Sequence, residues 1–370
     1  MKVVISAGGT GGHIFPALAI INKIKEKEPN SEFLYIGTTD RMEKDIVPKY
    51  GIKFIGIEMK GLNRHKLFKN FEVISSLSRA IKKCKKIIKE FNPDIVLGVG
   101  GYITYPVITA AHCMGYKTFI HEQNSIPGLS NKILMRKVDA IGVSLKDSMK
   151  YFPKKKTIYT GNPRSEEAIN VKEVDKSKYG LSNDKKLVLI VMGSLGSLTI
   201  NNIMKNILPK FKNKNYEVLF ITGKNYYNDY KKIDNIPKNV KIVEFLNDML
   251  NVMKKTDLII SRAGASSIAE ITALSIPSIL IPSPYVTHNH QYKNALVLEK
   301  NGASILIKED ELTDEILIKK IDEILNNNKK YDIMKKKSKS LAVVNSSTKI
   351  YEVIKKVING DKWWMILLNI

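Results

Sequence analysis

Two blocks of alternating strand-like and helix-like segments constrain this chain more than any other feature. Short apolar runs, each followed by a longer segment of helical period, occur in both halves of the sequence. They cover residues 3–5, 33–36, 95–99 and 118–121, and then 187–191, 218–221, 242–245, 258–261, 278–281 and 303–307. This βαβ rhythm predicts an α/β fold with two parallel sheets, each covered by helices on both faces.

The rhythm is interrupted once, between Gly161-Asn162-Pro163 and a polar, lysine-rich stretch that runs to Asp184. A chain of 370 residues also exceeds the usual size of one hydrophobic core, so we expect two domains with a boundary near 161–185. Ligands of doubly wound sheets bind outside the carboxyl ends of the strands. We therefore expect the binding site in a cleft between the two domains.

The composition favours a soluble protein of a reducing compartment. The apolar share of 44% and the charged share of 26% are ordinary for globular proteins. Cys84 and Cys113 are too few for a disulfide framework and too far apart for a Cys-x-x-Cys site. The first apolar run is too short for a signal peptide, and no stretch has the eighteen or so apolar residues of a membrane span.

The net charge of +24 is unusual and suits phosphate-rich partners such as nucleic acid, anionic lipid or a nucleotide. Lysine is abundant along the whole chain, however, so a generic solvated surface explains much of this charge equally well. The charge becomes informative only where it clusters.

A glycine-rich loop, Gly-Gly-Thr-Gly-Gly-His at residues 8–13, follows the first apolar run and leads into a predicted helix with Pro16 in its first turn. Such a loop lets the backbone approach a ligand and directs free N–H groups toward it. The dinucleotide fingerprint fails because Ile14 stands where glycine or alanine is required, and no Gly-Lys-Ser/Thr follows as in a P-loop. A merely tight turn would not account for four glycines beside a histidine.

Two further clusters, one rich in glycine and one polar, follow predicted strands in the first half. Gly-Val-Gly-Gly-Tyr at 98–102 ends one strand, and His-Glu-Gln-Asn at 121–124 ends the next. A surface loop could have this composition, but polar side chains at the carboxyl end of a buried strand more often form a site.

The second half repeats the arrangement of strand, small-residue loop and helix. Gly-Ser-Leu-Gly-Ser at 193–197 is a second candidate phosphate cradle, and Ser-Arg-Ala-Gly-Ala-Ser-Ser at 261–267 is a further glycine-containing loop. Glu270 lies one turn into the helix that follows. A carboxylate there can accept hydrogen bonds from both ribose hydroxyls, as in dinucleotide sites, so Glu270 is our candidate ribose ligand.

We expect no metal and no cofactor. His288 and His290 alternate on a loop without an evident third ligand at zinc-site spacing, and the chain contains no Asp-x-Asp. Helix dipoles, backbone N–H groups and Arg164 would then neutralise the charge of a leaving diphosphate.

Taken together, these motifs resemble the MurG family of transferases, which move N-acetylglucosamine from UDP to undecaprenyl-pyrophosphoryl-N-acetylmuramoyl-pentapeptide. The loops at 8–13, 100–102, 121–124, 161–163 and 261–265 occur in family order over nearly the whole chain. The resemblance implies a GT-B glycosyltransferase fold of two Rossmann-like domains facing a cleft. It further implies inverting transfer to the C4 hydroxyl of the muramyl sugar, converting lipid I to lipid II in peptidoglycan synthesis.

The resemblance also implies domain bounds and partners. Residues 1–163 would form an acceptor- and membrane-facing domain, 164–345 a UDP-sugar domain, and 346–370 a helix that crosses back to the first domain. The partners would be UDP-N-acetylglucosamine as donor substrate, the undecaprenyl-linked muramyl-pentapeptide and anionic lipid, with no nucleic acid. The protein would be peripheral on the cytoplasmic face of the bacterial membrane.

Site residues follow from the same resemblance. His13 would be the general base, since an unperturbed histidine with a pKa of about 6.5 accepts a proton near neutrality; a structural role in capping the loop is the alternative. The residues expected to bind substrate are Thr10, Gly11, Gly12, Asn124, Arg164, Ser194, Leu246 through its backbone, Ala265, Ser266, Ser267, Glu270 and Gln291. The chain departs from the family in the 192–197 loop, which lacks one glycine and one polar residue, and in Arg164, which comes one residue early.

Basic residues cluster between Lys60 and Glu90. They are Lys60, Arg64, Lys66, Lys69, Arg79, Lys82, Lys83, Lys85, Lys86 and Lys89, with apolar Leu62, Leu67, Phe68, Phe71, Ile74, Leu77 and Ile81 among them. This pattern fits a peripheral patch for anionic lipid, and fits equally well an amphipathic helix with a solvated lysine face.

Two other classes of function remain as alternatives. Another GT-B enzyme, such as a UDP-N-acetylglucosamine 2-epimerase or a glycolipid synthase, would share the nucleotide-binding half, but the amino-terminal glycine loops fit the muramyl-lipid transferases better. A nucleic-acid binder would need aromatic or arginine-rich surfaces, whereas the basic residues here are mostly lysine.

Overall fold

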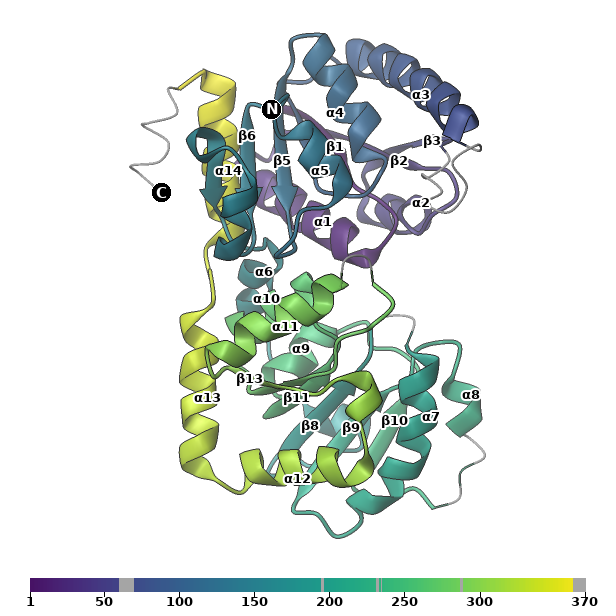
Figure 1. The fold of residues 1–370 in the computed structure, drawn as a ribbon, viewed down its shortest axis with the longest axis vertical. Coiled ribbons are helices and arrows are strands. Elements are labelled where there is room, and N and C mark those ends of the chain that lie inside the picture. The colour runs from purple at the N-terminus through teal and green to yellow at the C-terminus, as the bar shows by residue number, and fades with distance from the viewer. Residues whose placement is uncertain (60–69, 194–195, 231–232, 234, 287–288, 362–370) are drawn as a thin grey trace. The chain divides into compact units, whose positions relative to one another are not determined.

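The computed structural model describes residues 1–59, 70–193, 196–230, 233, 235–286 and 289–361. The chain forms two compact units (Figure 1). Unit 1 contains Met1–Arg164 together with Asn345–Ile370, and unit 2 contains Ser165–Val344. After helix α13 (Asn328–Ser340) in unit 2, the chain therefore ends in unit 1 with helix α14 (Ser346–Asn359).

Unit 1 is built on a parallel sheet with strand order β3-β2-β1-β4-β5-β6-β7. The strands are β1 (Lys2–Ser6), β2 (Glu32–Thr38), β3 (Lys53–Ile57), β4 (Ile95–Gly98), β5 (Lys117–Glu122), β6 (Ala140–Val143) and β7 (Thr157–Tyr159). The order reverses between β1 and β4, which pair directly, with Ser6 opposite Gly98. The loops after these two strands therefore leave the sheet side by side, at the position where doubly wound folds bind ligands.

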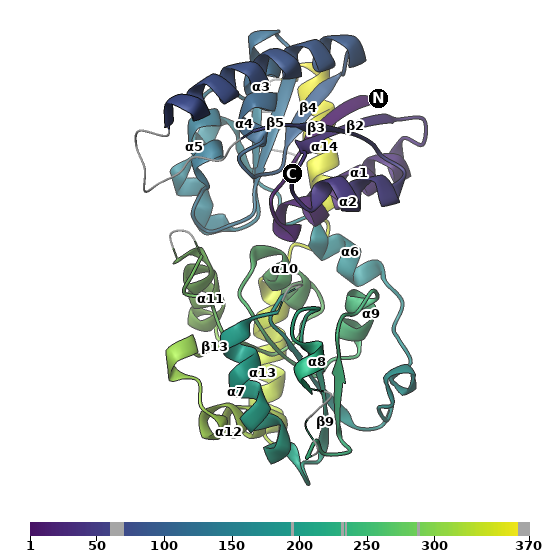
Figure 2. The same ribbon diagram turned by 90° about the vertical axis from the view of Figure 1, so that its right-hand side faces the viewer.

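Successive side chains of β1 point to opposite faces of the sheet and are apolar on both, so unit 1 needs helices on both faces. Val3 and Ile5 point into one core with the helices α1 (Gly11–Lys27) and α14. Val4 points into a second core with α3 (Asn70–Phe91) and α4 (Thr104–Cys113). Figure 2 shows these two helix pairs on opposite sides of the sheet. The remaining α-helices of unit 1 are α2 (Glu43–Ile46) and α5 (Leu129–Leu134).

Unit 2 repeats this construction with strand order β10-β9-β8-β11-β12-β13, again all parallel. Its strands are β8 (Lys186–Val191), β9 (Tyr216–Ile221), β10 (Val240–Val243), β11 (Leu258–Ser261), β12 (Ser278–Leu280) and β13 (Ser304–Leu306). Its α-helices besides α13 are α6 (Arg164–Asn170), α7 (Leu198–Ile207), α8 (Tyr227–Tyr230), α9 (Met249–Lys254), α10 (Ala265–Ala273), α11 (His290–Lys300) and α12 (Asp314–Leu325), of which α6 begins with the last residue of unit 1. The order in which successive strands are added to the sheet reverses between β8 and β11, which pair directly. The loops that lead from these strands into α7 and α10 are therefore neighbours.

Helix α14 is fixed to unit 1 by polar contacts as well as by its apolar face. The Ser346 and Ser347 hydroxyls donate to the carbonyl oxygens of Asn162 and Pro163 at 2.6 and 2.9 Å. At its other end, Lys355 forms an ion pair with Glu28 at 2.8 Å. The hydrogen bond from Lys355 lowers the pKa of the Glu28 carboxyl below its ordinary value.

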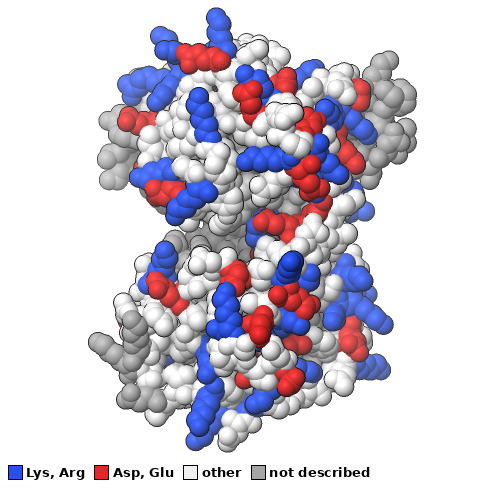
Figure 3. All heavy atoms as spheres, turned by 180° about the vertical axis from the view of Figure 1, so that it is seen from behind, with Lys and Arg blue, Asp and Glu red and all other residues white. Residues whose placement is uncertain are grey.

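The described part of the basic cluster is the outer face of α3. Arg79, Lys82, Lys83, Lys85, Lys86 and Lys89 are all exposed, whereas Ala80, Cys84, Ile87 and Ile88 face the core. Leu77 and Ile81 are half-buried, and the remaining apolar residues of the predicted patch lie outside the described residues or have undescribed side chains. Elsewhere, Lys and Arg are spread over both units among Asp and Glu on the face drawn in Figure 3. Across the described helices, none combines the length and apolar character needed to cross a bilayer.

Candidate active site

The first glycine loop connects β1 to α1 and is held on two sides. Gly9 has a φ of +89°, a conformation that favours glycine, and Thr10 is the extended N-cap of α1, whose carbonyl oxygen accepts the N–H groups of His13 and Ile14. The Gly8 N–H donates to the carbonyl oxygen of Gly100 at 3.2 Å. The loop therefore rests directly on the second glycine loop, and Gly11 and Gly12 open α1.

His13 is half-buried in the first turn of α1, over the second glycine loop. Its Nδ1 lies 3.0 Å from the carbonyl oxygen of Gly8. Its ring packs so closely on Gly100 that a Cβ at that position would come 2.5 Å from His13 Cδ2. Because a carbonyl oxygen only accepts, Nδ1 carries the proton in neutral His13, and Nε2 is the nitrogen with the lone pair.

The second glycine loop has no room for side chains. Gly100 and Gly101 have φ values of +98° and +90°. A Cβ at Gly101 would lie 2.5 Å from the carbonyl oxygen of Gly8. The sequence pattern at 98–102 therefore reflects a close approach of two backbones beside His13.

The third loop, 121–124, combines structural side chains with one candidate ligand. His121 is fully buried, and its Nε2 lies 3.0 Å from the carbonyl oxygen of Gly161. Burial lowers the pKa of His121 to about 4, so this ring is neutral at physiological pH. The Gln123 amide donates to the carbonyl oxygen of Val99 at 3.0 Å. Both side chains thus tie strand ends together.

Glu122 organises the turn that presents Asn124. Its carboxylate accepts the Asn124 N–H at 2.9 Å, the Gly128 N–H at 3.1 Å and the Asn131 amide at 2.8 Å. Asn124 itself is half-buried. Because β4 and β5 are paired neighbours, with Gly98 opposite Ile120, this turn leaves the same edge of the sheet as the two glycine loops.

Arg164 ends unit 1 with its guanidinium over a ring of α1. The guanidinium carbon lies 5.5 Å from the centre of the Phe15 ring, and the Arg164 N–H donates to the Asn162 side chain at 3.1 Å. A cation–π contact of this kind holds the side chain next to the helix that carries His13.

In unit 2, Arg262 links the loops after β8 and β11. Its guanidinium donates to the Ser197 hydroxyl at 2.8 Å and to the Ile281 carbonyl oxygen at 3.1 Å, and it forms an ion pair with Glu309. Arg262 and Glu309 are both buried. This pairing places the N-termini of α7 and α10 at one edge of the sheet, with Gly196, at φ +76°, against the backbone of Thr222.

The first turns of α10 carry four of the predicted ligands on one helix. Gly264 is the extended N-cap, followed by Ala265, Ser266 and Ser267. Ser266 and Glu270 are four residues apart and so share a face of α10. The Ser266 hydroxyl is buried and makes no hydrogen bond to any residue within the described ranges. An unsatisfied hydroxyl in the first turn of a helix is suited to an incoming polar ligand.

The other predicted ligands of unit 2 lie on neighbouring segments. Leu246 follows β10 with its side chain buried in the core, and the prediction for this residue concerns its backbone alone. Gln291 is in the first turn of α11, and its side-chain oxygen Oε1 accepts the Ser283 N–H at 2.9 Å. Ser194 lies outside the described residues.

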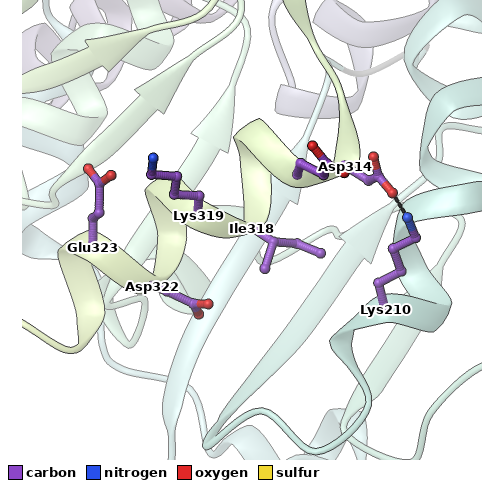
Figure 4. A pocket seen from close by; sticks show the side chains of 7 residues that line it. Lys210, Asp314, Ile318, Lys319, Asp322 and Glu323 are labelled. Atoms are coloured by element: carbon purple, nitrogen blue, oxygen red, sulfur yellow. Dashed lines mark ion pairs between the residues drawn. The ribbon is translucent and has the colours of Figure 1, made fainter.

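The histidines near residue 290 form no metal-binding group within the described part of the chain. His288 is outside the described residues, and within those that are described no three His, Cys, Asp or Glu side chains form a metal-binding group. A hollow of about 480 Å³ lies elsewhere, on α12. Its side chains come from α12 and from Lys210, which pairs with Asp314 (Figure 4), and it includes none of the predicted ligands.

Glu43 and Glu309 are buried charged residues that lie outside the predicted motifs, and both hold loops of the site. Glu43 binds the first glycine loop, and Glu309 neutralises Arg262. An acidic residue in a polar segment that contains other acidic residues has no periodicity or motif that would reveal its burial.

Comparison with known proteins agrees with this architecture. The Glycosyltransferase family 28 N-terminal domain matches residues 3–143, and the Glycosyltransferase family 28 C-terminal domain matches residues 187–355. Two doubly wound parallel-sheet units with these matches define a UDP-sugar-dependent glycosyltransferase of the GT-B fold.

A curated relative from Bacillus cytotoxicus is 45% identical over 361 residues, covering 96% of this chain and 99% of its own. It is named UDP-N-acetylglucosamine–N-acetylmuramyl-(pentapeptide) pyrophosphoryl-undecaprenol N-acetylglucosamine transferase. The chain belongs to the MurG family.

Solved structures show the same fold. MurG from Acinetobacter baumannii is 24% identical, with a TM-score of 0.77 over 96% of this chain and 99% of that one. A Listeria monocytogenes structure assigned as a UDP-N-acetylglucosamine 2-epimerase is 16% identical, with a TM-score of 0.72 and 97% of both chains covered. The fold alone therefore does not separate transferase from epimerase.

Proposed function

We infer that this protein transfers N-acetylglucosamine from UDP-N-acetylglucosamine to the muramyl sugar of undecaprenyl-linked muramyl-pentapeptide, the step from lipid I to lipid II in peptidoglycan synthesis. The observation that carries this function is the 45% identity to a transferase of that name over both units. The matched region includes the glycine loops of unit 1. An epimerase has no acceptor substrate and so would not require these loops.

His13 is the general base of this proposal. The Nδ1 contact with the Gly8 carbonyl oxygen leaves Nε2 as the proton acceptor. The acceptor C4 hydroxyl loses its proton to Nε2 as its oxygen bonds to the anomeric carbon of the donor sugar. The bond from that carbon to the diphosphate oxygen breaks on the opposite face, which inverts the configuration and releases UDP. Thr10, Gly11, Gly12 and Asn124 surround the acceptor end of the reaction.

The donor binds unit 2 in this proposal. The N-termini of α7 and α10 face the diphosphate with free N–H groups, and the Ser266 and Ser267 hydroxyls add donors. Glu270, nearly buried on the same face as Ser266, accepts both ribose hydroxyls. Ser194, the Leu246 backbone, Ala265 and Gln291 complete the set, and Arg164 supplies positive charge toward the diphosphate. The reaction needs no metal or cofactor, so activity should survive saturating EDTA.

The third part of the proposal is peripheral binding to anionic lipid on the cytoplasmic face of the membrane. The exposed basic residues of α3 support it, because each Lys or Arg near an anionic surface contributes about 1 kcal/mol. Nucleic acid is not a partner. Co-sedimentation with anionic vesicles should be lost in a Lys82→Glu, Lys86→Glu variant and should weaken with salt, whereas neutral vesicles and duplex DNA should not bind.

Transfer of radiolabelled N-acetylglucosamine to a short-tailed lipid I analogue tests the activity directly. We expect labelled lipid II analogue from the wild type, with the anomeric configuration inverted. If folded protein converts the donor to its 2-epimer and never labels the acceptor, the transferase function is wrong and the epimerase alternative replaces it.

A further inference from the structure

Glu43, the first residue of α2, is a fully buried carboxylate that no predicted ligand set contains. Its two oxygens accept three hydrogen bonds. Oε2 accepts the Gly9 N–H at 3.1 Å. Oε1 accepts the N–H and the hydroxyl of Thr38 at 3.0 and 2.8 Å. Charge-assisted hydrogen bonds of this kind are about twice as strong as neutral ones, so the carboxylate holds the ends of β1 and β2 together.

The backbone around Glu43 is shaped to admit this carboxylate. A Cβ at Gly8 would lie 2.5 Å from Glu43 Oε1, and a Cβ at Gly37 would lie 2.6 Å from Glu43 Cγ. Both positions are glycine. The first glycine loop therefore accommodates a buried acid on one side, in addition to any ligand it binds.

The hydrogen bonds of one peptide unit connect Glu43 to His13. The peptide between Gly8 and Gly9 presents its N–H to Glu43 Oε2 and its carbonyl oxygen to His13 Nδ1 at 3.0 Å. In a trans peptide the N–H and C=O point in opposite directions, so fixing one end orients the other. An anionic acceptor on the N–H also polarises the peptide and strengthens its carbonyl oxygen as an acceptor.

We propose that Glu43 is a positioning residue for His13, acting through the Gly8–Gly9 peptide plane. By orienting this carbonyl oxygen, it keeps His13 in the tautomer whose Nδ1 is protonated and whose Nε2 accepts the proton. When His13 becomes an imidazolium during the reaction, the polarised carbonyl also stabilises the added charge. This inference rests on the proposed function of His13 as a base.

A purely structural role for Glu43 makes a different prediction. Its bonds to Thr38 hold α2 against β2, so loss of Glu43 would then lower stability without changing the protonation pattern of His13. The two roles are separated by observing the His13 ring itself.

The experiment compares wild type with Glu43→Gln in protein labelled with ¹⁵N-histidine. A Gln side chain has one acceptor and one donor group, so it cannot accept from both Gly9 and Thr38. Long-range ¹H–¹⁵N spectra report which ring nitrogen carries the proton, and His13→Ala assigns the His13 signals. We expect the Nδ1–H tautomer alone in wild type and a measurable Nε2–H population in Glu43→Gln.

Kinetics provide the second measurement. We expect kcat to fall at least about tenfold in Glu43→Gln, and by no more than the 10²–10⁴-fold that a general base contributes in full. The KM for UDP-N-acetylglucosamine should stay within about twofold, since unit 2 holds the donor.

Glu217→Gln is the matched control, because Glu217 is a buried carboxylate in unit 2 that accepts the Ser182 N–H at 2.8 Å. We expect it to lower stability while leaving the His13 spectrum and kcat as in wild type. An unchanged His13 spectrum in Glu43→Gln, or equal changes in both variants, overturns the proposal. If Glu43→Gln does not fold, the His13 spectrum of Glu43→Asp replaces it. Asp keeps the negative charge, but its side chain is one methylene shorter, so its carboxylate lies farther from the Gly9 N–H.

The spectrum also separates this inference from the proposed function. If the tautomer shifts in Glu43→Gln but wild type never glycosylates the lipid I analogue, positioning of His13 holds and the assigned reaction fails. If wild type is active and the tautomer does not respond, the reaction stands and Glu43 is not a positioning residue.

Discussion

The imidazole of His13 and the α-carbon of Gly100 are packed so closely that no side chain fits between them. A Cβ built on Gly100 would lie 2.5 Å from His13 Cδ2 and 2.9 Å from Nε2. The two glycine loops of unit 1 therefore define the orientation of one ring, and that ring is the centre of the first two predictions.

Replacing His13 with alanine should lower kcat by roughly 10²–10⁴-fold, because a positioned general base contributes about that much. The pH–rate profile of the wild type should have an acid limb, where the base becomes protonated, and the variant should lose it. Steady-state transfer to the lipid I analogue across pH 5.5–9 measures both. An unchanged rate and profile would show that His13 only caps the loop.

Gly100→Ala should reduce both stability and activity, and Gly115→Ala is its matched control. Both residues have positive φ, +98° and +76°, so both variants incur a backbone cost of about 1–2 kcal/mol. Only Gly100→Ala also drives a methyl group into His13, since a Cβ at Gly115 would have no neighbour within 4 Å among the described residues. We expect a further loss of about 1–3 kcal/mol in the free energy of unfolding, and a lower kcat, for Gly100→Ala alone. Equal urea midpoints would contradict the packing described here.

Glu270→Gln should weaken UDP binding about 10- to 100-fold, equivalent to ~1.5–3 kcal/mol for hydrogen bonds to a charged group. Isothermal titration with UDP measures this, and 2′,3′-dideoxy-UDP provides the decisive comparison. Because the lost contacts are to the ribose hydroxyls, the dideoxy ligand should bind wild type and variant alike. Glu315→Gln, at an exposed site on α12, should bind UDP as wild type does. A variant that loses equal affinity for both ligands would place Glu270 elsewhere in the site.

His121 should make stability fall as the pH falls below neutrality. Burial lowers its pKa from 6.5 to about 4, so between these values the unfolded chain binds a proton that the folded chain does not. The stabilisation is therefore complete above pH 6.5 and is lost progressively as the pH falls to about 4. Between pH 7.5 and 5 this amounts to about 2 kcal/mol.

Urea unfolding at the two pH values checks this prediction, with His121→Gln and His112→Gln compared. His112 is exposed, so its replacement should leave the pH dependence intact, whereas His121→Gln should remove about 2 kcal/mol of it. Identical pH dependence in all three proteins would mean that His121 does not titrate as described.

The sequence predicted all six strands of the unit 2 sheet but only β1, β2, β4 and β5 of the seven strands in unit 1. β1, β4 and β8 are buried on both faces and appear as continuous apolar runs. β3 was missed because it is an edge strand with half-buried residues and an internal glycine. β6 and β7 were missed because they are short, with four residues including a glycine and three residues, respectively. The predicted strand at 242–245 begins earlier in the structure, at Val240, because its pairing with β9 sets its bounds.

The site was predictable where glycine marks a close approach and was not where burial depends on tertiary packing. The loops at 8–13 and 98–102, both singled out by their glycines, are adjacent because they follow the paired strands β1 and β4. Nothing in the segment around Glu43 indicates a buried carboxylate, since that role depends on Gly9 and Thr38 from two other segments. The return of α14 to unit 1 was likewise an implication of family resemblance rather than of any local pattern.

Because α14 returns to unit 1, unit 1 is completed only after unit 2 during synthesis on the ribosome. All of unit 2 is translated before Ile350, Val353, Ile354 and Val357 exist to cover the apolar side of α1. A nascent chain therefore has a complete second unit while the first still exposes part of its core. Such an interval is one in which chaperones bind and misassembly occurs, so slow translation after residue 344 would prolong the vulnerable state of the unit that carries His13.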